Sequence, residues 1–195
     1  LEPNILLVGG PRQVTYHTHD EAKYSQYADG NIEGFIEKEC AGYLVEIDDT
    51  TLNKTYRNNK DICCFANSIY PNFKPCEYEG QELTNHDGVF FVSSADVDGY
   101  LEKYNPVQLR DSRKKVVNQN YPVMTFGESK GLTFDRVLIY QTTPMVQWIF
   151  DRRKELKNQS RSKFYVAVTR AKYSVAIVLD NTKNQVADGI SEYKV

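Results

Sequence analysis

The chain has 195 residues, 41% of them apolar and 12% aromatic, and carries a formal net charge of −2 at pH 7. This length suits one domain of ordinary size plus a flanking piece, and the apolar content excludes a disordered chain. No apolar run approaches the ~18 residues of a membrane-spanning helix, and no signal peptide opens the sequence. We therefore expect a folded protein without a membrane partner.

The cysteines and the distribution of charge indicate which kinds of site the chain can contain. No C-x-x-C pair occurs among Cys40, Cys63, Cys64 and Cys76, which argues against a zinc site or a disulfide framework and for reduced thiols in a cytoplasmic protein. Residues 100–172 carry 15 Lys+Arg against 6 Asp+Glu, whereas the remainder carries 9 against 20. A polyanion-binding face confined to one stretch gives such a segregation, and an exposed surface of mixed charge is the alternative.

Hydrophobic periodicity and turn residues predict the first elements. Residues 4–9 form a short apolar run ended by Gly-Gly-Pro, as in a buried parallel strand that enters a loop. Asn58 or Asn59 can cap a helix that Pro71 stops. Two polar helices are expected around residues 20–28 and 31–40, a strand from Tyr43 to Ile47, and an irregular connection over residues 71–87.

The second half of the chain continues the alternation of strands and helices. The expected elements are a strand at residues 89–92, a helix capped by Ser93 or Ser94 that runs to about Tyr104, strands at 121–126 and 136–140, helices at 145–157 and 161–172, and a strand at 173–179. Apolar strands that alternate with helices predict an α/β fold with a mostly parallel sheet.

Four segments, in order along the chain, carry a family resemblance. Residues 125–137 (TFGESKGLTFDRV) and 165–172 (YVAVTRAK) resemble motifs V and VI of superfamily 1 helicases of the UvrD/Rep type. Residues 7–16 (LVGGPRQVTY) and 52–59 (LNKTYRNN) resemble motifs III and IV. The resemblance implies the C-terminal portion of an ATP-dependent DNA helicase, with a RecA-like (P-loop NTPase-type) domain of mostly parallel sheet flanked by helices.

The resemblance also implies how the chain is divided. Residues 1–42 would be the tail of the first motor domain, and residues 43–195 the second RecA-like domain. Arg57 and Thr125 lie 68 positions apart, too close for the large accessory domain of UvrD-type enzymes. The sequence contains no G-x-x-x-x-G-K-[ST] phosphate loop. We therefore expect the loop that binds ATP and the ligands of Mg²⁺ to lie upstream, in the first motor domain of the same polypeptide, and the fragment alone to be inactive.

The same motifs imply residues for the nucleotide site. Arginine suits phosphoryl transfer because its planar, permanently charged fork pairs with phosphate oxygens. By resemblance, Arg57 and Arg170 are the two arginine fingers, Tyr56 stacks on adenine, and Gln13 contacts the γ-phosphate and senses hydrolysis. Gly131 stands where the backbone would approach the nucleotide. The alternatives are surface salt bridges for the arginines, core packing for Tyr56 and a loop amide for Gln13.

Motif residues also point to single-stranded or forked DNA. Thr125 resembles a contact to the DNA backbone, and Ser129 and Lys130 would meet phosphates, which are contacts that ignore sequence and weaken with salt. Tyr16 resembles an aromatic residue that stacks on a base, a contact worth ~1–3 kcal/mol per base. No residue is assigned to a metal.

Four positions depart from the family pattern. Gly10 replaces an aspartate of motif III, Thr18 a tryptophan platform, Gly127 a histidine of motif V, and Thr133 a glutamate that bonds the ribose. These departures keep open a non-catalytic, single-stranded nucleic-acid-binding or regulatory module derived from a helicase. The acidic remainder keeps open a protein-interaction scaffold. Motif V also resembles the 5′–3′ RecD-like branch, but motifs III and IV favour 3′–5′ movement.

Overall fold

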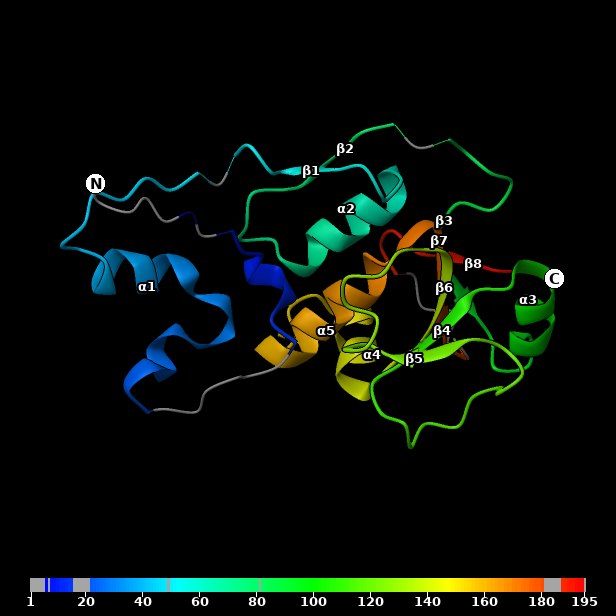
Figure 1. Cartoon of the computed structure of the whole chain (residues 1–195). Coiled ribbons are helices and arrows are strands. Elements are labelled where there is room, and N and C mark those ends of the chain that lie inside the picture. Colours follow the sequence, from blue (N-terminus) through cyan, green and yellow to red (C-terminus); the bar gives the residue numbers. More distant parts are fainter. Residues whose placement is uncertain are drawn as a thin grey trace.

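The computed structural model describes residues 6, 8–15, 22–48, 50–80, 82–180 and 187–194. In this part of the chain the body is a six-stranded sheet of order β5-β4-β6-β7-β3-β8, whose pairings are all parallel, with helices on both faces (Figure 1). The predicted α/β fold is therefore confirmed. The strands of the sheet are β3 Gly88–Val92, β4 Val107–Arg110, β5 Val123–Thr125, β6 Phe134–Tyr140, β7 Ala171–Val178 and β8 Ser191–Glu192.

Helices and a second, two-stranded sheet complete the structure. The short strands β1 and β2 pair in parallel beside α2 (Figure 1). Among the described residues no helix has the length and apolar character needed to cross a bilayer. The remaining elements are β1 Lys54–Thr55, β2 Glu77–Tyr78, the 3-10 helices η1 Pro11–Gln13 and η2 Ala22–Gly30, and the α-helices α1 Ile32–Glu39, α2 Lys60–Ile69, α3 Val97–Tyr104, α4 Thr143–Phe150 and α5 Asn158–Val168.

The central strands β6 and β7 are buried on both faces, as the middle of a parallel sheet must be. On one face, α2, α4 and α5 contribute Phe65, Trp148 and Phe164, whose rings meet edge to face with centroids 5.9–6.1 Å apart. On the other face, Tyr100 and Leu101 of α3 are fully buried. This double burial fixes the ends of β6 and β7, where the candidate site lies.

The start of α2 is tied directly to the sheet. Asn59 caps the helix, because its side-chain oxygen accepts the Ile62 N–H at 3.1 Å. The amide nitrogen of the same side chain donates to the carbonyl of Tyr173 in β7 at 2.7 Å. The predicted cap and helix are therefore confirmed, and the cap residue also anchors the helix to a central strand.

Some strand predictions were wrong. Residues 43–47 form no strand, and their apolar side chains Tyr43, Leu44, Val45 and Ile47 are exposed. Residues 6 and 8–10 also lie outside any strand; the rest of that predicted strand is outside the described residues. Apolar content alone does not make a strand, because a strand needs a neighbouring edge to satisfy its backbone groups, and no described strand pairs with either segment.

Strand β4 was missed because a polar residue interrupts its apolar run. Gln108 is nevertheless fully buried, and its amide is satisfied: it donates to the Asn118 carbonyl at 2.7 Å and accepts from the Tyr140 hydroxyl at 2.8 Å. Short strands such as β1, β2 and β8 were missed for lack of length.

Three helix boundaries also differ from the predictions. The helix expected after Ser93 or Ser94 begins at Val97, and the helix expected over 145–157 ends at Phe150. The third matters for function: α5 ends at Val168 and β7 begins at Ala171, so Arg170 lies in the tight connection between them and not in a helix.

Leu109 in the centre of β4 is fully buried and provides a test of this strand. We expect Leu109→Ala to lower the free energy of unfolding by about 2–5 kcal/mol, through lost burial and the cavity left behind. Val116, in the loop after β4, is 88% exposed, so Val116→Ala should change it by less than about 0.5 kcal/mol. Denaturant unfolding of both variants makes the comparison, and equal losses would show that β4 is not part of the core.

Candidate functional site

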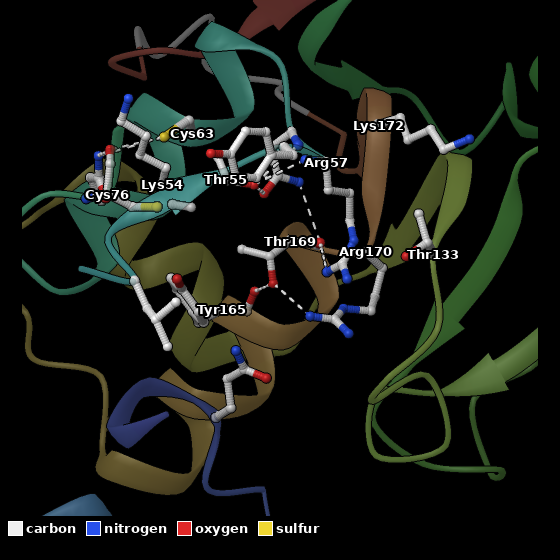
Figure 2. Close-up of a pocket in the computed structure, with 16 residues that line it drawn as sticks. Lys54, Thr55, Arg57, Cys63, Cys76, Thr133, Tyr165, Thr169, Arg170 and Lys172 are labelled. Carbon is white, nitrogen blue, oxygen red and sulfur yellow. Dashed lines mark hydrogen bonds between the residues drawn. The ribbon is translucent and has the colours of Figure 1, made fainter. Parts of the chain in front are cut away.

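A cavity of about 530 Å³ lies at the amino ends of β6 and β7. Its walls come from segments far apart in the sequence: η1, the segment from Leu52 to Asn58, α2, and the connection between α5 and β7 (Figure 2). Four of the five residues predicted to bind nucleotide line it, namely Gln13, Tyr56, Arg57 and Arg170. The structure therefore brings together residues from the segments that resemble motifs III, IV and VI.

Arg170 is a buried cation, with 2% of its surface exposed. Its guanidinium donates to the carbonyls of Val166 and Leu132, at 3.1 and 3.3 Å, and to the hydroxyl of Thr169 at 3.2 Å. These acceptors are neutral. Burial, and secondly the nearby charge of Arg57, lower the pKa of Arg170 to about 10, so it remains charged at neutral pH.

Arg57 reaches the same place from the opposite wall of the cavity. Its guanidinium donates to the Thr169 carbonyl at 3.1 Å, across 112 positions of sequence. Figure 2 shows Arg57 and Arg170 converging on the connection that holds Thr169. The two arginines therefore meet around one short piece of backbone.

The cavity is strongly cationic. Its described lining includes Lys54, Arg57, Arg170 and Lys172 and no carboxylate. Lys54 and Lys172 form ion pairs with Glu79 and Asp135, at 2.9 and 3.1 Å. Arg57 and Arg170 form no ion pair with any described residue. Guanidinium groups held only by neutral acceptors keep their charge available, and an anionic ligand is what such a site can bind.

Gln13 is held at the cavity by the residue before it. Arg12 donates to the Lys74 carbonyl, and its guanidinium lies 5.4 Å from the ring centroid of Phe73 and 5.9 Å from that of Tyr165. The Arg12 carbonyl accepts from the Tyr70 hydroxyl at 3.4 Å. These contacts dock η1 against α2 and α5.

The domain boundary expected at residue 42 stays a prediction.

Tyr56 is 69% exposed, so it does not contribute to the core. Its ring lies at the wall of the cavity next to Arg57, as an aromatic platform for a base would. Gly131, by contrast, does not line the cavity. Its φ of +86° explains the glycine, because side-chain-bearing residues disfavour this conformation, and no atom lies near where a side chain would begin. Thr133 of the same motif does line the cavity.

The predicted DNA contacts lie elsewhere, at the carboxyl end of β5. Ser129 needs a correction: it is fully buried and its hydroxyl donates to the Phe126 carbonyl at 2.8 Å, so it holds the turn and presents nothing to a phosphate. Lys130 is exposed. Tyr16 lies outside the described residues.

Thr125 is occupied within its own turn. Its N–H and its hydroxyl donate to the Glu128 carboxylate at 2.7 and 2.9 Å. The pKa of Glu128 is lowered to about 2, first by the hydrogen bond from the Thr125 N–H and second by the hydrogen bond from Arg113 to the same carboxylate. A DNA phosphate at Thr125 would therefore have to displace a carboxylate that is charged at neutral pH.

Several residues that the structure brings to these two places carry no binding role predicted from the sequence. Asn58, Lys54 and Lys172 line the cavity, and Asn58 was considered only as a helix cap. The exposed pair Lys114 and Lys115 follows β4, next to the Thr125 turn, because Arg110 of β4 pairs with Thr125 of β5. The run of three basic residues at 113–115 is the sequence feature that could have predicted a cationic surface beside Thr125.

The described residues offer no evident metal site. No group of three or more His, Cys, Asp or Glu side chains gathers among them in a way that suits a metal ion. Among the described residues that line the cavity there is also no carboxylate of the kind that usually binds Mg²⁺.

Comparison with known proteins finds a family match over part of the chain. Residues 100–182 match the UvrD-like helicase C-terminal domain. This range includes motifs V and VI, so the resemblance to UvrD-like helicases is confirmed there. No curated protein matches the chain significantly.

Similar solved structures are helicases, at low similarity. The PRRSV helicase is 20% identical with a TM-score of 0.41, over 69% of this chain and 24% of that one. An arterivirus nonstructural protein 10 (helicase) in complex with DNA is 22% identical with a TM-score of 0.41, over 68% and 26%. The C-terminal domain of a possible DNA helicase from Lactobacillus plantarum is 13% identical with a TM-score of 0.41, over 72% and 99%. The chain thus spans about a quarter of the viral helicases.

The effect of replacing Arg170 on the free energy of unfolding distinguishes a structural role of this residue from a ligand-binding role. A buried cation without an acidic partner costs desolvation free energy, so we expect Arg170→Met to change the free energy of unfolding by less than about 1 kcal/mol, or to raise it. Arg136 serves as the comparison, because it also donates to three neutral acceptors, Ser174 and Thr84, each at 2.8 Å, and the His86 carbonyl, but is only partly buried, so less desolvation opposes these bonds. Arg136→Met should lose about 2 kcal/mol or more. A larger loss for Arg170→Met than for Arg136→Met would contradict a ligand-binding role.

Proposed function

We propose that this chain is the second motor domain of a superfamily 1 ATP-dependent DNA helicase, in which Arg57 and Arg170 stabilise the transition state of ATP hydrolysis. The observation that carries the proposal is the convergence of these two arginines, with Gln13 and Tyr56, on one cavity whose described lining has no carboxylate. The match of residues 100–182 to the UvrD-like helicase C-terminal domain supports it.

The chemistry follows from what charge does during phosphoryl transfer. Negative charge spreads over the oxygens of the γ-phosphoryl group as its bond to the leaving oxygen weakens. Arg57 and Arg170 would leave their carbonyl acceptors and bond these oxygens, where a stronger acceptor repays the exchange. Each carries a fixed positive charge, and an arginine finger can increase the rate by ~10³–10⁵-fold.

The remaining lining suits the other parts of ATP. Tyr56 would stack on the adenine, and the Gln13 amide would donate to a γ-phosphate oxygen or accept from the attacking water. The phosphate loop and the Mg²⁺ ligands would come from the first motor domain, so this chain alone should bind ATP weakly and not hydrolyse it. Thr133 lines the cavity where the family has a ribose-binding glutamate, so the ribose would be held without a carboxylate.

DNA would bind at the carboxyl ends of the strands, opposite the end of the sheet where the cavity lies. The loop after β4 and the turn after β5 follow the carboxyl ends of adjacent parallel strands and present Lys114, Lys115 and Lys130. Flexible, exposed cations suit contact with phosphates irrespective of sequence. Separate edges for nucleotide and DNA fit a motor that closes two domains on ATP and reopens after hydrolysis, with 3′–5′ movement as the proposed direction.

A non-catalytic nucleic-acid-binding module is the alternative function. Gly10, Gly127 and Thr133 favour it, since each replaces a polar or charged side chain of the family pattern. The buried, carboxylate-free Arg170 argues against it, because a domain that binds no nucleotide gains nothing from keeping an unneutralised cation in its interior.

The test of the catalytic proposal is ATP hydrolysis, stimulated by single-stranded DNA, in the longer protein that contains this chain. We expect Arg170→Ala to lower kcat by at least ~10³-fold with ATP binding nearly intact, because Arg170 acts on the transition state. Arg170→Lys should recover little, since lysine lacks the planar fork. Lys103→Ala is a control in α3, on the other face of the sheet and outside the cavity lining, and should leave kcat unchanged.

Two results would reject the catalytic proposal. One is a wild-type protein whose ATP hydrolysis does not respond to DNA, and the other is an Arg170→Ala variant that keeps its full rate. DNA binding without hydrolysis would favour the non-catalytic module.

The DNA surface predicts a salt effect. Removing one phosphate contact with Lys130→Ala should weaken binding to single-stranded DNA and reduce the slope of log K against log salt by about 0.7. Lys103→Ala should leave the slope unchanged, because α3 leads into the amino end of β4, opposite the Lys130 edge. Fluorescence anisotropy over a salt series measures both, and equal slopes for Lys130→Ala and the wild type would remove Lys130 from the interface.

A further inference from the structure

Asn58 is buried, with 4% of its surface exposed, and uses its side-chain amide fully. The nitrogen donates to two backbone carbonyls, those of Thr169 at 3.3 Å and Ala171 at 2.7 Å. These are the carbonyls of the residues immediately before and after Arg170. One side chain therefore forms hydrogen bonds to the backbone on both sides of the buried arginine.

The oxygen of the same amide orders the opposite wall of the cavity. It accepts from the Thr55 hydroxyl at 3.1 Å. The Thr55 oxygen in turn accepts the N–H groups of Arg57 and Asn58, each at 3.3 Å. These bonds close a compact turn over residues 55–58, from which the Tyr56 and Arg57 side chains project.

Asn58 and Arg57 share an acceptor, which links the two walls. The Thr169 carbonyl receives both the Asn58 amide and the Arg57 guanidinium, at 3.3 and 3.1 Å. The neighbouring Asn59 adds a bond from its backbone N–H to the Lys172 carbonyl at 3.2 Å. The connection between α5 and β7 is thus bonded repeatedly to the turn that carries Arg57.

Such bonding is needed because the arginines carry like charges in a partly desolvated cavity. Their repulsion favours separating the two walls, and among the described residues no carboxylate in the cavity lining offsets it. Neutral hydrogen bonds can hold the walls together without neutralising either cation. An amide is well suited, because it supplies two donors and an acceptor from one short side chain.

We propose that Asn58 is a positioning residue that holds Arg57 and Arg170 at the separation needed to meet one phosphoryl group together. This role rests on the function proposed above. Asn58 itself does not touch the reacting atoms; it acts through the backbone around Arg170 and through the turn that carries Arg57. Displacement of a catalytic group by about 1 Å can cost 10²-fold in rate, so a positioning residue can matter as much as a contact.

The first test measures the bonding itself, in the 195-residue chain, by hydrogen–deuterium exchange. Asn58→Ala should raise amide exchange in residues 54–59 and 169–173 by about tenfold or more, while β3 and the centre of β6 stay protected. Asn118→Ala is the matched control, a partly buried asparagine whose amide donates to Asp98 at 2.8 Å, away from the cavity. It should leave both segments unchanged.

A second variant guards against simple loss of folding. Asn58→Leu keeps roughly the size of the side chain but removes both donors and the acceptor without adding a charge. It should raise exchange in residues 169–173 even if Asn58→Ala does not fold. Wild-type exchange in residues 169–173 of a folded Asn58 variant would overturn the proposal.

The second test measures positioning, by DNA-stimulated ATP hydrolysis in the longer protein. Asn58→Ala should lower kcat by about 10²-fold and change the KM for ATP by less than about threefold. Combined with Arg170→Ala, it should cost little more, because both changes remove the same transition-state contact. Additive losses would overturn the proposal. Absence of DNA-stimulated hydrolysis in the wild type would reject the proposed function instead, and the exchange experiment would still decide whether Asn58 joins the walls.

Discussion

Two guanidinium groups of like charge share one cavity, and the surrounding structure is built around holding them there. Arg57 and Arg170 are bonded by backbone carbonyls and a hydroxyl, none of which carries charge. A carboxylate would bind them more strongly, but it would also neutralise the charge that a phosphate needs. Neutral acceptors keep both cations in place at a modest cost, and the buried one keeps its proton because its pKa stays far above neutrality.

The parallel sheet supplies the rigidity that this arrangement requires. Arg170 immediately precedes β7, and Thr133 immediately precedes β6, so both are set by the two most deeply buried strands. The Asn59 side chain bonds α2 to β7 through the Tyr173 carbonyl. This bond places the turn that contains Arg57 at the same end of the sheet. The basic loops after β4 and β5 lie at the other end of the strands. One sheet thereby separates a cationic cavity from an exposed cationic surface.

Much of this architecture could be read from the sequence. The alternation of strands and helices, the cap at Asn59 and the grouping of Gln13, Tyr56, Arg57 and Arg170 all followed from patterns in the chain. Burial could not be read in the same way: Ser129 looked like a phosphate contact but is an interior hydroxyl, and Thr125 is bonded to Glu128. Segment 43–47 shows the reverse error, because its pattern predicts a strand but no described strand pairs with it. Asn58 escaped notice because its partners, 111 and 113 positions away, become neighbours only in the fold.

The proposed function requires both arginines to exchange carbonyl acceptors for a phosphate. The most direct measurement is a crystal structure of the longer protein with a non-hydrolysable ATP analogue and DNA. We expect Arg57 and Arg170 both to lie within hydrogen-bond distance of γ-phosphate oxygens, with the adenine against Tyr56. An analogue bound while both guanidinium groups remain on the Thr169 and Leu132 carbonyls, without touching phosphate, would contradict it.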